Sequence, residues 1–364
     1  MTGFTAGDAA GLEHEFGRQR PQRCDVLQYV WGDQPVFWYE QKAQLVEAVA
    51  RTHNITVWTE FPIGGHPWDA CLKDIEEFKP SVVISHAFTM DMMHMVNAAV
   101  RHKDVWFVQV LHENFPSWNG SRLAQKRLVI AEAPSNMLFG TVSRHMHATW
   151  TQMVGDRVVY MPNLLPWPEY SSRRDWMEDG HCNIAIAGRF SWEKNLPTQV
   201  TAAALFARAE PNVRLYLVLP DHVDSDQVAR YARTVIGKGD ERVFWLTWMA
   251  GREWLRCASQ HIDMLLACSL TEGFSYQHWE AAALRMWQVT HPSSEFGIKP
   301  TDSIDPLSIT EAIRRVYHKE SDVLLDEQCE LAEYYRTESE QKLIHTFQTL
   351  LEKTPTFAYV GTLA

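Results

Sequence analysis

Short apolar runs alternate with helical stretches along most of this chain, and the alternation constrains the fold more than any other feature. Helical patterns lie between the first six runs, for example at 40–51 and 92–100. Alternating strands and helices predict βαβ units, and therefore a mostly parallel sheet with helices on both faces. The strands expected in this first half are 25–30, 55–59, 81–85, 105–111, 138–142 and 158–161.

A second series of apolar runs follows, and 364 residues are too many for one compact core, so we expect two domains. Its strands are expected at 183–187, 214–219, 243–246, 264–267 and 288–290. We predict an α/β fold of two doubly wound, Rossmann-like domains that face a central cleft at the carboxyl ends of both sheets. The expected parts are an N-terminal tail at 1–24, an N-terminal domain at 25–162, a linker at 163–182, a C-terminal domain at 183–321 and C-terminal helices at 322–364.

Composition narrows the class of protein. With 46% hydrophobic and 22% charged residues the chain is globular rather than disordered. The net charge of −11 argues against a passive nucleic-acid coat. The six cysteines are scattered without a Cys-x-x-Cys, which argues against structural zinc and a disulfide framework. We find neither a transmembrane run nor the apolar core of a signal peptide, and therefore expect a cytoplasmic protein.

The stretch LTEGFSYQHWEAAA, at 270–283, carries a pair of carboxylates around the start of a predicted helix. Glu272 precedes the helix, together with the backbone amides of Gly273 and Phe274, and Glu280 lies about two turns into it. Two carboxylates so placed can accept hydrogen bonds from a polyol, while the helix N-terminus can hold a phosphate. The alternative is that Glu272 only caps the helix and Glu280 is solvated on its surface.

A second stretch, AGRFSWEKN at 187–195, directly follows the strand expected at 183–187. Gly188 permits a tight turn, and Arg189 and Lys194 present two cations beyond it. Such a pair can bind a diphosphate and stabilise the charge that grows on it as a leaving group. Taken alone, two cations at the start of a helix are more often just solvated.

Together the two stretches resemble the retaining glycosyltransferases of the GT-B fold, in the large group of family 4-like enzymes. The order of the two motifs, their spacing of about eighty residues and their strand–helix context all agree. The first motif is matched by Gly188, Arg189, Phe190, Lys194 and Asn195. The second is matched by Ser269, Glu272, Gly273, Phe274, Glu280, Ala281 and Ala283.

The resemblance implies a role for each matched residue. Arg189 and Lys194 would hold the donor diphosphate, and Glu280 would bind the nucleotide ribose. Glu272 would contact the hydroxyls of the transferred sugar. The remaining donor contacts implied are Gly188, Gly273, Phe274, Ser275 and Gly32. The C-terminal helices at 322–364 would pack back on the N-terminal domain.

The first domain resembles the family less closely. VLHEN at 110–114 is similar to its strand-end His-Asp segment, so His112 would touch the donor sugar, although Glu113 replaces the usual aspartate. YMPNL at 160–164 is similar to the turn before the family's linker. Trp31 stands where a second glycine is common; with Trp38 it forms either packed core or a stacking platform for the acceptor.

The second motif also departs from the family after Ala283. The sequence there, ALRMWQVT at 283–290, has Arg285 and Trp287 in place of small residues and no proline before Val289. The departures leave the diphosphate residues intact, but sugar identity and acceptor stay open. Asp224-Ser225-Asp226 has the form of a metal-binding Asp-x-Asp, which we interpret as a helix cap in a polar loop; we expect no catalytic metal and no bound cofactor.

The resemblance therefore implies a retaining, metal-independent glycosyltransferase with a nucleotide-diphosphate sugar as donor, a UDP-sugar being favoured. The expected acceptor is a carbohydrate or lipid-linked saccharide. A hydroxylated DNA base is the alternative, since Arg122, Lys126 and Arg127 form a small basic cluster that could follow a phosphate backbone. A non-catalytic nucleotide-sugar sensor is a third possibility. A nicotinamide dehydrogenase is rejected, because no G-x-G-x-x-G follows the first strand. Oligomeric state stays open.

Overall fold

The computed structural model describes residues 21–30, 37–60, 68–86, 92–112, 129–165, 175–188, 192–219, 223–237, 240–247, 249, 252–270, 275–318 and 323–356. These residues divide into two compact units. The first unit holds the described residues up to His112, those from 129 to Leu164 and those from Ser339 onward. The second holds the described residues from Leu165 to Glu338.

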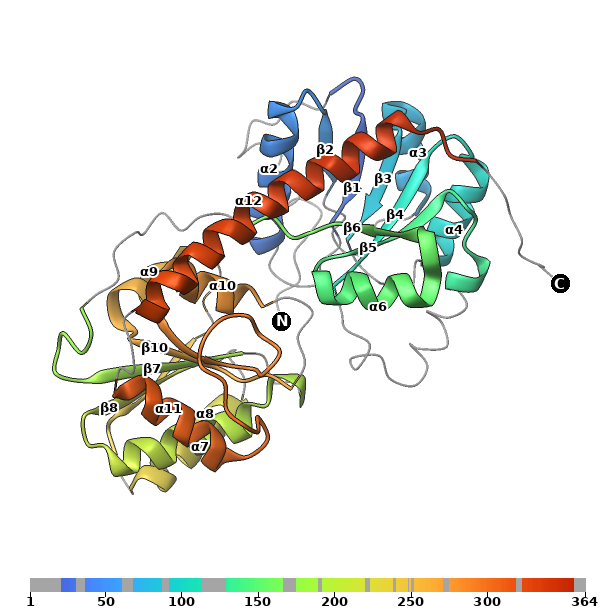
Figure 1. The fold of residues 1–364 in the computed structure, drawn as a ribbon. Helices are drawn as coiled ribbons and strands as arrows, with labels where there is room; N and C mark the ends of the chain where they lie inside the picture. The colour runs from blue at the N-terminus through green and yellow to red at the C-terminus, as the bar shows by residue number, and fades with distance from the viewer. Residues whose placement is uncertain are drawn as a thin grey trace, which may run out of the picture. The chain divides into compact units, whose positions relative to one another are not determined.

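The first unit is built on a parallel sheet with the order β2-β1-β3-β4-β5-β6 (Figure 1). Its strands are β1 (Val26–Tyr29), β2 (Val57–Glu60), β3 (Val82–Ser85), β4 (Trp106–Leu111), β5 (Met137–Thr141) and β6 (Val158–Tyr160). The helices between them are α2 (Phe37–Thr52), α3 (Trp68–Phe78), α4 (Met92–Arg101) and α6 (Arg144–Val154). Strands β1, β3 and β5 are buried at every position, as expected for strands covered on both faces.

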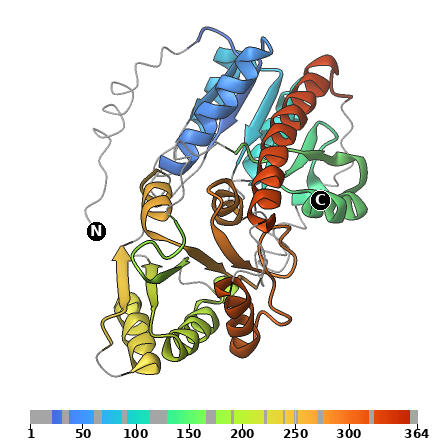
Figure 2. The same ribbon diagram turned by 60° about the vertical axis from the view of Figure 1, so that its left-hand side comes forward.

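The second unit is built on a parallel sheet with the order β11-β10-β7-β8-β9 (Figure 2). Its strands are β7 (Cys182–Ala187), β8 (Val213–Leu219), β9 (Val243–Thr247), β10 (Met264–Ala267) and β11 (Trp287–Thr290). The helices are α7 (Leu196–Ala209), α8 (Val223–Ile236), α9 (Arg252–His261), α10 (Tyr276–Ala283) and α11 (Pro306–Tyr317).

Two apolar layers fill this second unit, one on each face of its sheet. Successive residues of a strand point to opposite faces. In β7, Ile184 and Ile186 therefore join the core beneath α7, α8 and α11, whereas Ala185 and Ala187 join the core beneath α9 and α10. Ala281 of α10 packs in the same core as these two alanines.

The last helix, α12 (Val323–Glu352), contributes to both units, and the boundary between them falls between Glu338 and Ser339 within it (Figure 1). In its first half, the indole of Trp279 donates to the Ala332 carbonyl over 2.9 Å. In its second half, the Thr346 hydroxyl donates to the Tyr160 carbonyl over 2.9 Å. Specific polar contacts therefore tie the helix to the unit on each side of that boundary.

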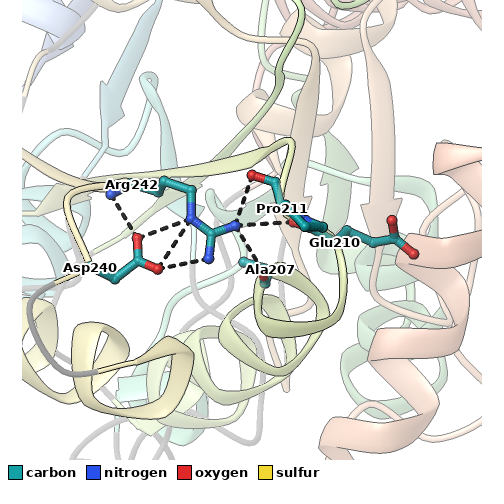
Figure 3. A network of polar contacts seen from close by, with 5 residues as sticks. All are labelled: Ala207, Glu210, Pro211, Asp240 and Arg242. Atoms are coloured by element: carbon teal, nitrogen blue, oxygen red, sulfur yellow. Dashed lines mark hydrogen bonds and ion pairs between the residues drawn. The ribbon is translucent and has the colours of Figure 1, made fainter.

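One arginine closes the C-terminal end of α7 (Figure 3). Nη1 of Arg242 donates to the carbonyl oxygens of Ala207, Glu210 and Pro211 at 2.9, 3.1 and 3.0 Å. Its Nε and Nη2 donate to the Asp240 carboxylate, and these hydrogen bonds hold the pKa of Asp240 below its usual value. Helix ends leave carbonyls without partners inside the helix, so this guanidinium supplies donors that the backbone cannot.

Two residues near β11 have left-handed backbone. Gly297 has φ of 75°, and a Cβ there would lie 2.8 Å from Cγ and the carbonyl oxygen of Gln288 and from Cγ2 of Thr290, so only glycine fits. Arg285 has φ of 54°, in a region that glycine adopts without strain, and pairs with Asp326 of α12.

The α/β fold class is confirmed, and each of the eleven strands expected from the sequence is present within one or two residues at either end. The position of the Asp-x-Asp was wrong: it lies inside the first turns of α8 rather than in a loop before it. Asp226 pairs there with Arg230 over 2.8 Å, one helical turn further on, which favours continuing the helix through this polar stretch.

Candidate functional site

Each sheet has one point at which the strand order reverses. In open parallel sheets, ligands bind outside the carboxyl ends of the strands at such points. In the first unit the order reverses between β1 and β3, and in the second between β7 and β10. Both motifs of the second unit follow the two strands at its reversal, since Gly188 follows β7 and the segment 268–275 follows β10.

Gly188 directly follows β7 and is closely packed against neighbouring side chains. Its N–H donates to the Val218 carbonyl over 3.3 Å, and a Cβ on it would lie 3.3 Å from Cδ2 of Leu196 and 3.7 Å from Cβ of Lys194. The short 3₁₀ turn Trp192–Lys194 therefore lies against the end of the strand. Residues 189–191, between the strand and this turn, lie outside the described part of the chain.

Asn195 fixes the turn to the neighbouring strand end. Its φ is 52°, a left-handed conformation that asparagine tolerates better than most residues. Its side-chain Nδ2 donates to the Cys268 carbonyl over 3.2 Å and to the Ser303 carbonyl over 2.7 Å. The residue is 7% exposed, so these hydrogen bonds are shielded from water.

The backbone on either side of Lys194 is held by further contacts with the same strand end. The Leu270 N–H donates to the Glu193 carbonyl over 2.7 Å. The Gln199 side chain donates to the Lys194 carbonyl over 2.6 Å and accepts from the Cys268 N–H over 3.0 Å. The two motifs, far apart in sequence, are thus joined at the reversal point of the sheet.

Helix α10 begins at the same place. Its N-cap is Ser275, whose hydroxyl accepts from the His278 N–H over 3.4 Å. The Gln277 side chain reaches back to the Ala187 carbonyl at the end of β7 over 3.5 Å. Glu280 is 4% exposed, which excludes the alternative of a solvated residue on the helix surface.

His278 is a residue that sequence reasoning missed. Its Nε2 donates to the Ala267 carbonyl over 2.9 Å, and its Nδ1 lies 3.0 Å from the Ser294 hydroxyl oxygen. Because a carbonyl can only accept, Nε2 carries the proton and the buried ring locks α10 onto the end of β10. A histidine three positions beyond an N-cap carries no sequence pattern that would have identified it.

In the first unit, His112 follows β4 and His86 follows the adjacent strand β3. Nε2 of His112 lies 3.4 Å from Nδ1 of His86, and the two rings are 5.6 Å apart between centroids. Nε2 of His86 lies 3.2 Å from Oε1 of Gln28, in β1. His86 was also missed, although its place directly after an apolar strand, like that of His112, could have identified it.

Several predicted site residues cannot be placed. Trp38 lies in α2, whose first six side chains are not described. The residues that lie outside the described part of the chain are Trp31, Gly32, Arg189, Glu272, Gly273 and Phe274 in the predicted site, and Arg122, Lys126 and Arg127 in the basic cluster.

Among the described residues no group of three histidine, cysteine, aspartate or glutamate side chains has a metal-binding arrangement. None of the helices in that part of the chain has the length and apolar character to cross a membrane. All six cysteines are free thiols, and burial raises the pKa of Cys24, Cys71 and Cys268 to about 12.

Two parallel, doubly wound sheets of this kind define the class of protein: the chain has the GT-B fold of glycosyltransferases. The sequence matches no protein-family model and no curated protein. Solved structures, however, resemble it over most of their length.

HepE from Anabaena, solved with UDP and glucose, is similar to this chain at a TM-score of 0.65 and 12% identity, over 89% of this chain and 99% of HepE. A glycosyltransferase from Rickettsia africae is similar at 0.63 and 10% identity, over 92% and 100%. A UDP-forming α,α-trehalose-phosphate synthase from Burkholderia xenovorans is similar at 0.60 and 13% identity, over 79% and 78%. At such identities the likeness shows a common fold.

Proposed function

We propose that this protein is a retaining glycosyltransferase that moves a sugar from a UDP-sugar to a hydroxyl of a carbohydrate or lipid-linked saccharide. One observation carries the proposal: at the strand-order reversal of the second unit, the Lys194 turn is hydrogen-bonded to the segment that leads into α10. A cation beside a helix N-terminus suits a diphosphate. The GT-B fold supports the proposal, as do the structures of HepE with UDP and with UDP-glucose.

The proposed donor contacts follow the matched motifs. Lys194 and Arg189 hold the diphosphate and stabilise it as it leaves, so the reaction needs no metal ion. Glu280, whose side chain is buried in α10, binds the ribose hydroxyls. Glu272 accepts hydrogen bonds from the transferred sugar. The backbone amides of Gly273 and Phe274, and the Ser275 hydroxyl at the N-cap, complete the donor site.

Retention of configuration follows if the acceptor enters on the face that the diphosphate leaves. The bond from the anomeric carbon to the phosphate oxygen breaks, the bond to the acceptor oxygen forms, and the departing phosphate oxygen takes the acceptor proton. No protein nucleophile is required. The chain supplies positioning, exclusion of water and cations on the leaving group.

In the first unit we propose that His112 contacts the transferred sugar and that Gly32 lies near the donor phosphates. Trp31 and Trp38 are proposed as acceptor contacts, because aromatic faces stack on sugar rings. Replacing Trp38 by alanine would then raise the KM for the acceptor and leave UDP affinity unchanged.

The test is binding and hydrolysis of UDP-, GDP-, ADP- and TDP-sugars by wild type, Glu272→Ala and Arg189→Ala, with and without a chelator. A suitable control is Arg230→Ala, which removes an exposed ion pair on α8. We expect one donor to be bound and hydrolysed without added metal, both motif variants to lose that activity and the control to keep it. NMR of the product decides the anomeric configuration.

The other outcomes decide against the proposal. Tight donor binding without hydrolysis, and without transfer to any saccharide acceptor, would indicate a nucleotide-sugar sensor. No binding of any nucleotide sugar would mean that this GT-B fold serves another purpose. An inverted product would contradict retention alone.

A further inference from the structure

Behind His112 a chain of side-chain hydrogen bonds crosses the first unit. Nε2 of His112 lies 3.4 Å from Nδ1 of His86, and Nε2 of His86 lies 3.2 Å from Oε1 of Gln28. Nε2 of Gln28 donates to Oγ1 of Thr59 over 2.6 Å, and that hydroxyl donates to Oε1 of Glu47 over 2.7 Å. The contacts run from the end of β4 through β3, β1 and β2 to α2.

The inner members of this chain of hydrogen bonds are buried, and the strands that carry it are neighbours in the sheet. Gln28, Thr59 and Glu47 are 1%, 2% and 9% exposed. The strand order β2-β1-β3-β4 places one member of the chain on each successive strand or directly after it. The His86 N–H also donates to the Tyr29 carbonyl over 3.0 Å, which fixes the backbone after β3.

In each hydrogen bond of this chain, the acceptor is the group that lies nearer to Glu47. A threonine hydroxyl has one proton, and that of Thr59 goes to the carboxylate, so Thr59 can only accept from Gln28. The amide nitrogen of Gln28 therefore faces Thr59, and its oxygen faces His86. A carbonyl oxygen only accepts, so Nε2 of His86 must carry a proton.

The same logic extends to the second ring. In the neutral imidazole of His86 a proton on Nε2 leaves Nδ1 as an acceptor. Nδ1 of His86 faces Nε2 of His112, so with a neutral His86 ring Nε2 of His112 carries the proton and donates. The hydrogen-bond-accepting nitrogen of His112 is then Nδ1.

We propose that His86 is a positioning residue: backed by Gln28, Thr59 and Glu47, it holds the ring of His112 in the tautomer with a proton on Nε2 and an accepting Nδ1. This inference rests on the proposed function in one respect, the contact of His112 with the transferred sugar. An accepting nitrogen selects a sugar that keeps a donating hydroxyl at that position, and disfavours a deoxy or O-methyl sugar there.

The tautomer can be tested without any activity, by long-range ¹⁵N–¹H NMR on protein labelled at its 16 histidines. The spectrum is recorded at about pH 8, where imidazole is ordinarily neutral. We expect a protected Nε2 proton on His112 in wild type. His86→Leu should lose it, whereas His86→Gln should keep it, because an amide oxygen can replace the accepting nitrogen. An unchanged His112 resonance in the leucine variant would overturn the inference.

Donor turnover gives the second readout. We expect His86→Leu to lower kcat for the donor about tenfold with unchanged UDP affinity, which corresponds to one hydrogen bond, and His86→Gln to recover most of it. Thr141→Val is the matched control, since it removes a threonine–histidine contact of 3.1 Å, to His147, outside the chain. Wild-type turnover in His86→Leu, where His112→Leu is inactive, would also overturn the inference.

The two proposals fail separately. A wild-type protein that neither binds nor hydrolyses any nucleotide sugar contradicts the proposed function, and the NMR comparison still decides the role of His86. Donor turnover that depends on Glu272 but not on His86, combined with an unchanged His112 resonance, refutes the positioning role alone.

Discussion

Replacing Asn195 separates two causes of stability at the centre of the second unit. In Asn195→Ala, the carbonyls of Cys268 and Ser303 each lose a shielded hydrogen bond, at about 1 kcal/mol apiece. Alanine is also strained in the left-handed backbone at φ of 52°, which lowers the free energy of unfolding by about 1 kcal/mol. We therefore expect a loss of about 3 kcal/mol in the free energy of unfolding. Asn195→Gly loses the same hydrogen bonds without the backbone strain, for a loss of about 2 kcal/mol.

Urea unfolding followed by tryptophan fluorescence measures both variants, and UDP calorimetry reports whether the Lys194 turn keeps its position. We expect the glycine variant to be the more stable of the two and both to bind UDP more weakly than wild type. Equal losses in the two variants would refute the backbone part of the reasoning. Losses below about 1 kcal/mol in both would refute the hydrogen-bond part.

Three further changes test other parts of the second unit. Gly297→Ala should lower the free energy of unfolding by about 2–4 kcal/mol, because the new Cβ adds backbone strain and steric overlap. Gly180→Ala has the same φ but no atom within 4 Å of the new Cβ, so it should lower the free energy of unfolding by only about 1 kcal/mol. Denaturant unfolding of both variants measures the difference. The pKa of Asp240 is lowered by Arg242, so its contribution is complete above the unfolded pKa of about 4 and is lost as pH falls further. The stability gap to Asp240→Asn should therefore shrink below that pH. Arg285→Gly should raise the thermal midpoint, because relief of left-handed strain outweighs an exposed ion pair.

The strands were predictable because a parallel strand that is buried on both faces needs apolar side chains at successive positions, and therefore appears in the sequence as a continuous apolar run. Met264–Ala267 was expected at the same residues that the structure gives, and every side chain in it is buried. Strand ends were predicted less accurately: β7 begins at Cys182, which the sequence analysis had placed in the linker. A cysteine beside a histidine is typical of a polar loop, and only the burial of Cys182 in the core beneath α7, α8 and α11 shows that it belongs to the strand.

Residues of the candidate site could be proposed from the sequence only where they belong to a recognisable motif. Gly188, Lys194, Asn195 and Glu280 were singled out from the two motifs, but the left-handed backbone of Asn195 and its two acceptors depend on β10 lying beside β7. His86 was missed for a related reason. Its place directly after an apolar strand could have identified it as a candidate, but its contact with His112 depends on β3 and β4 being neighbours in the sheet.

Two residues after Ala283 that differ from the pattern of the resembled family, Arg285 and Trp287, make packing contacts in the second unit. Trp287 is fully buried in β11, where it meets Trp176 edge-on at 6.3 Å between ring centroids. Arg285 pairs with Asp326 of α12. Both large side chains thus contact segments that flank the second sheet, while Glu280 stays buried in α10. Because Arg285 contacts α12 and Trp287 contacts the segment before β7, we expect these two residues to leave the choice of donor nucleotide unchanged.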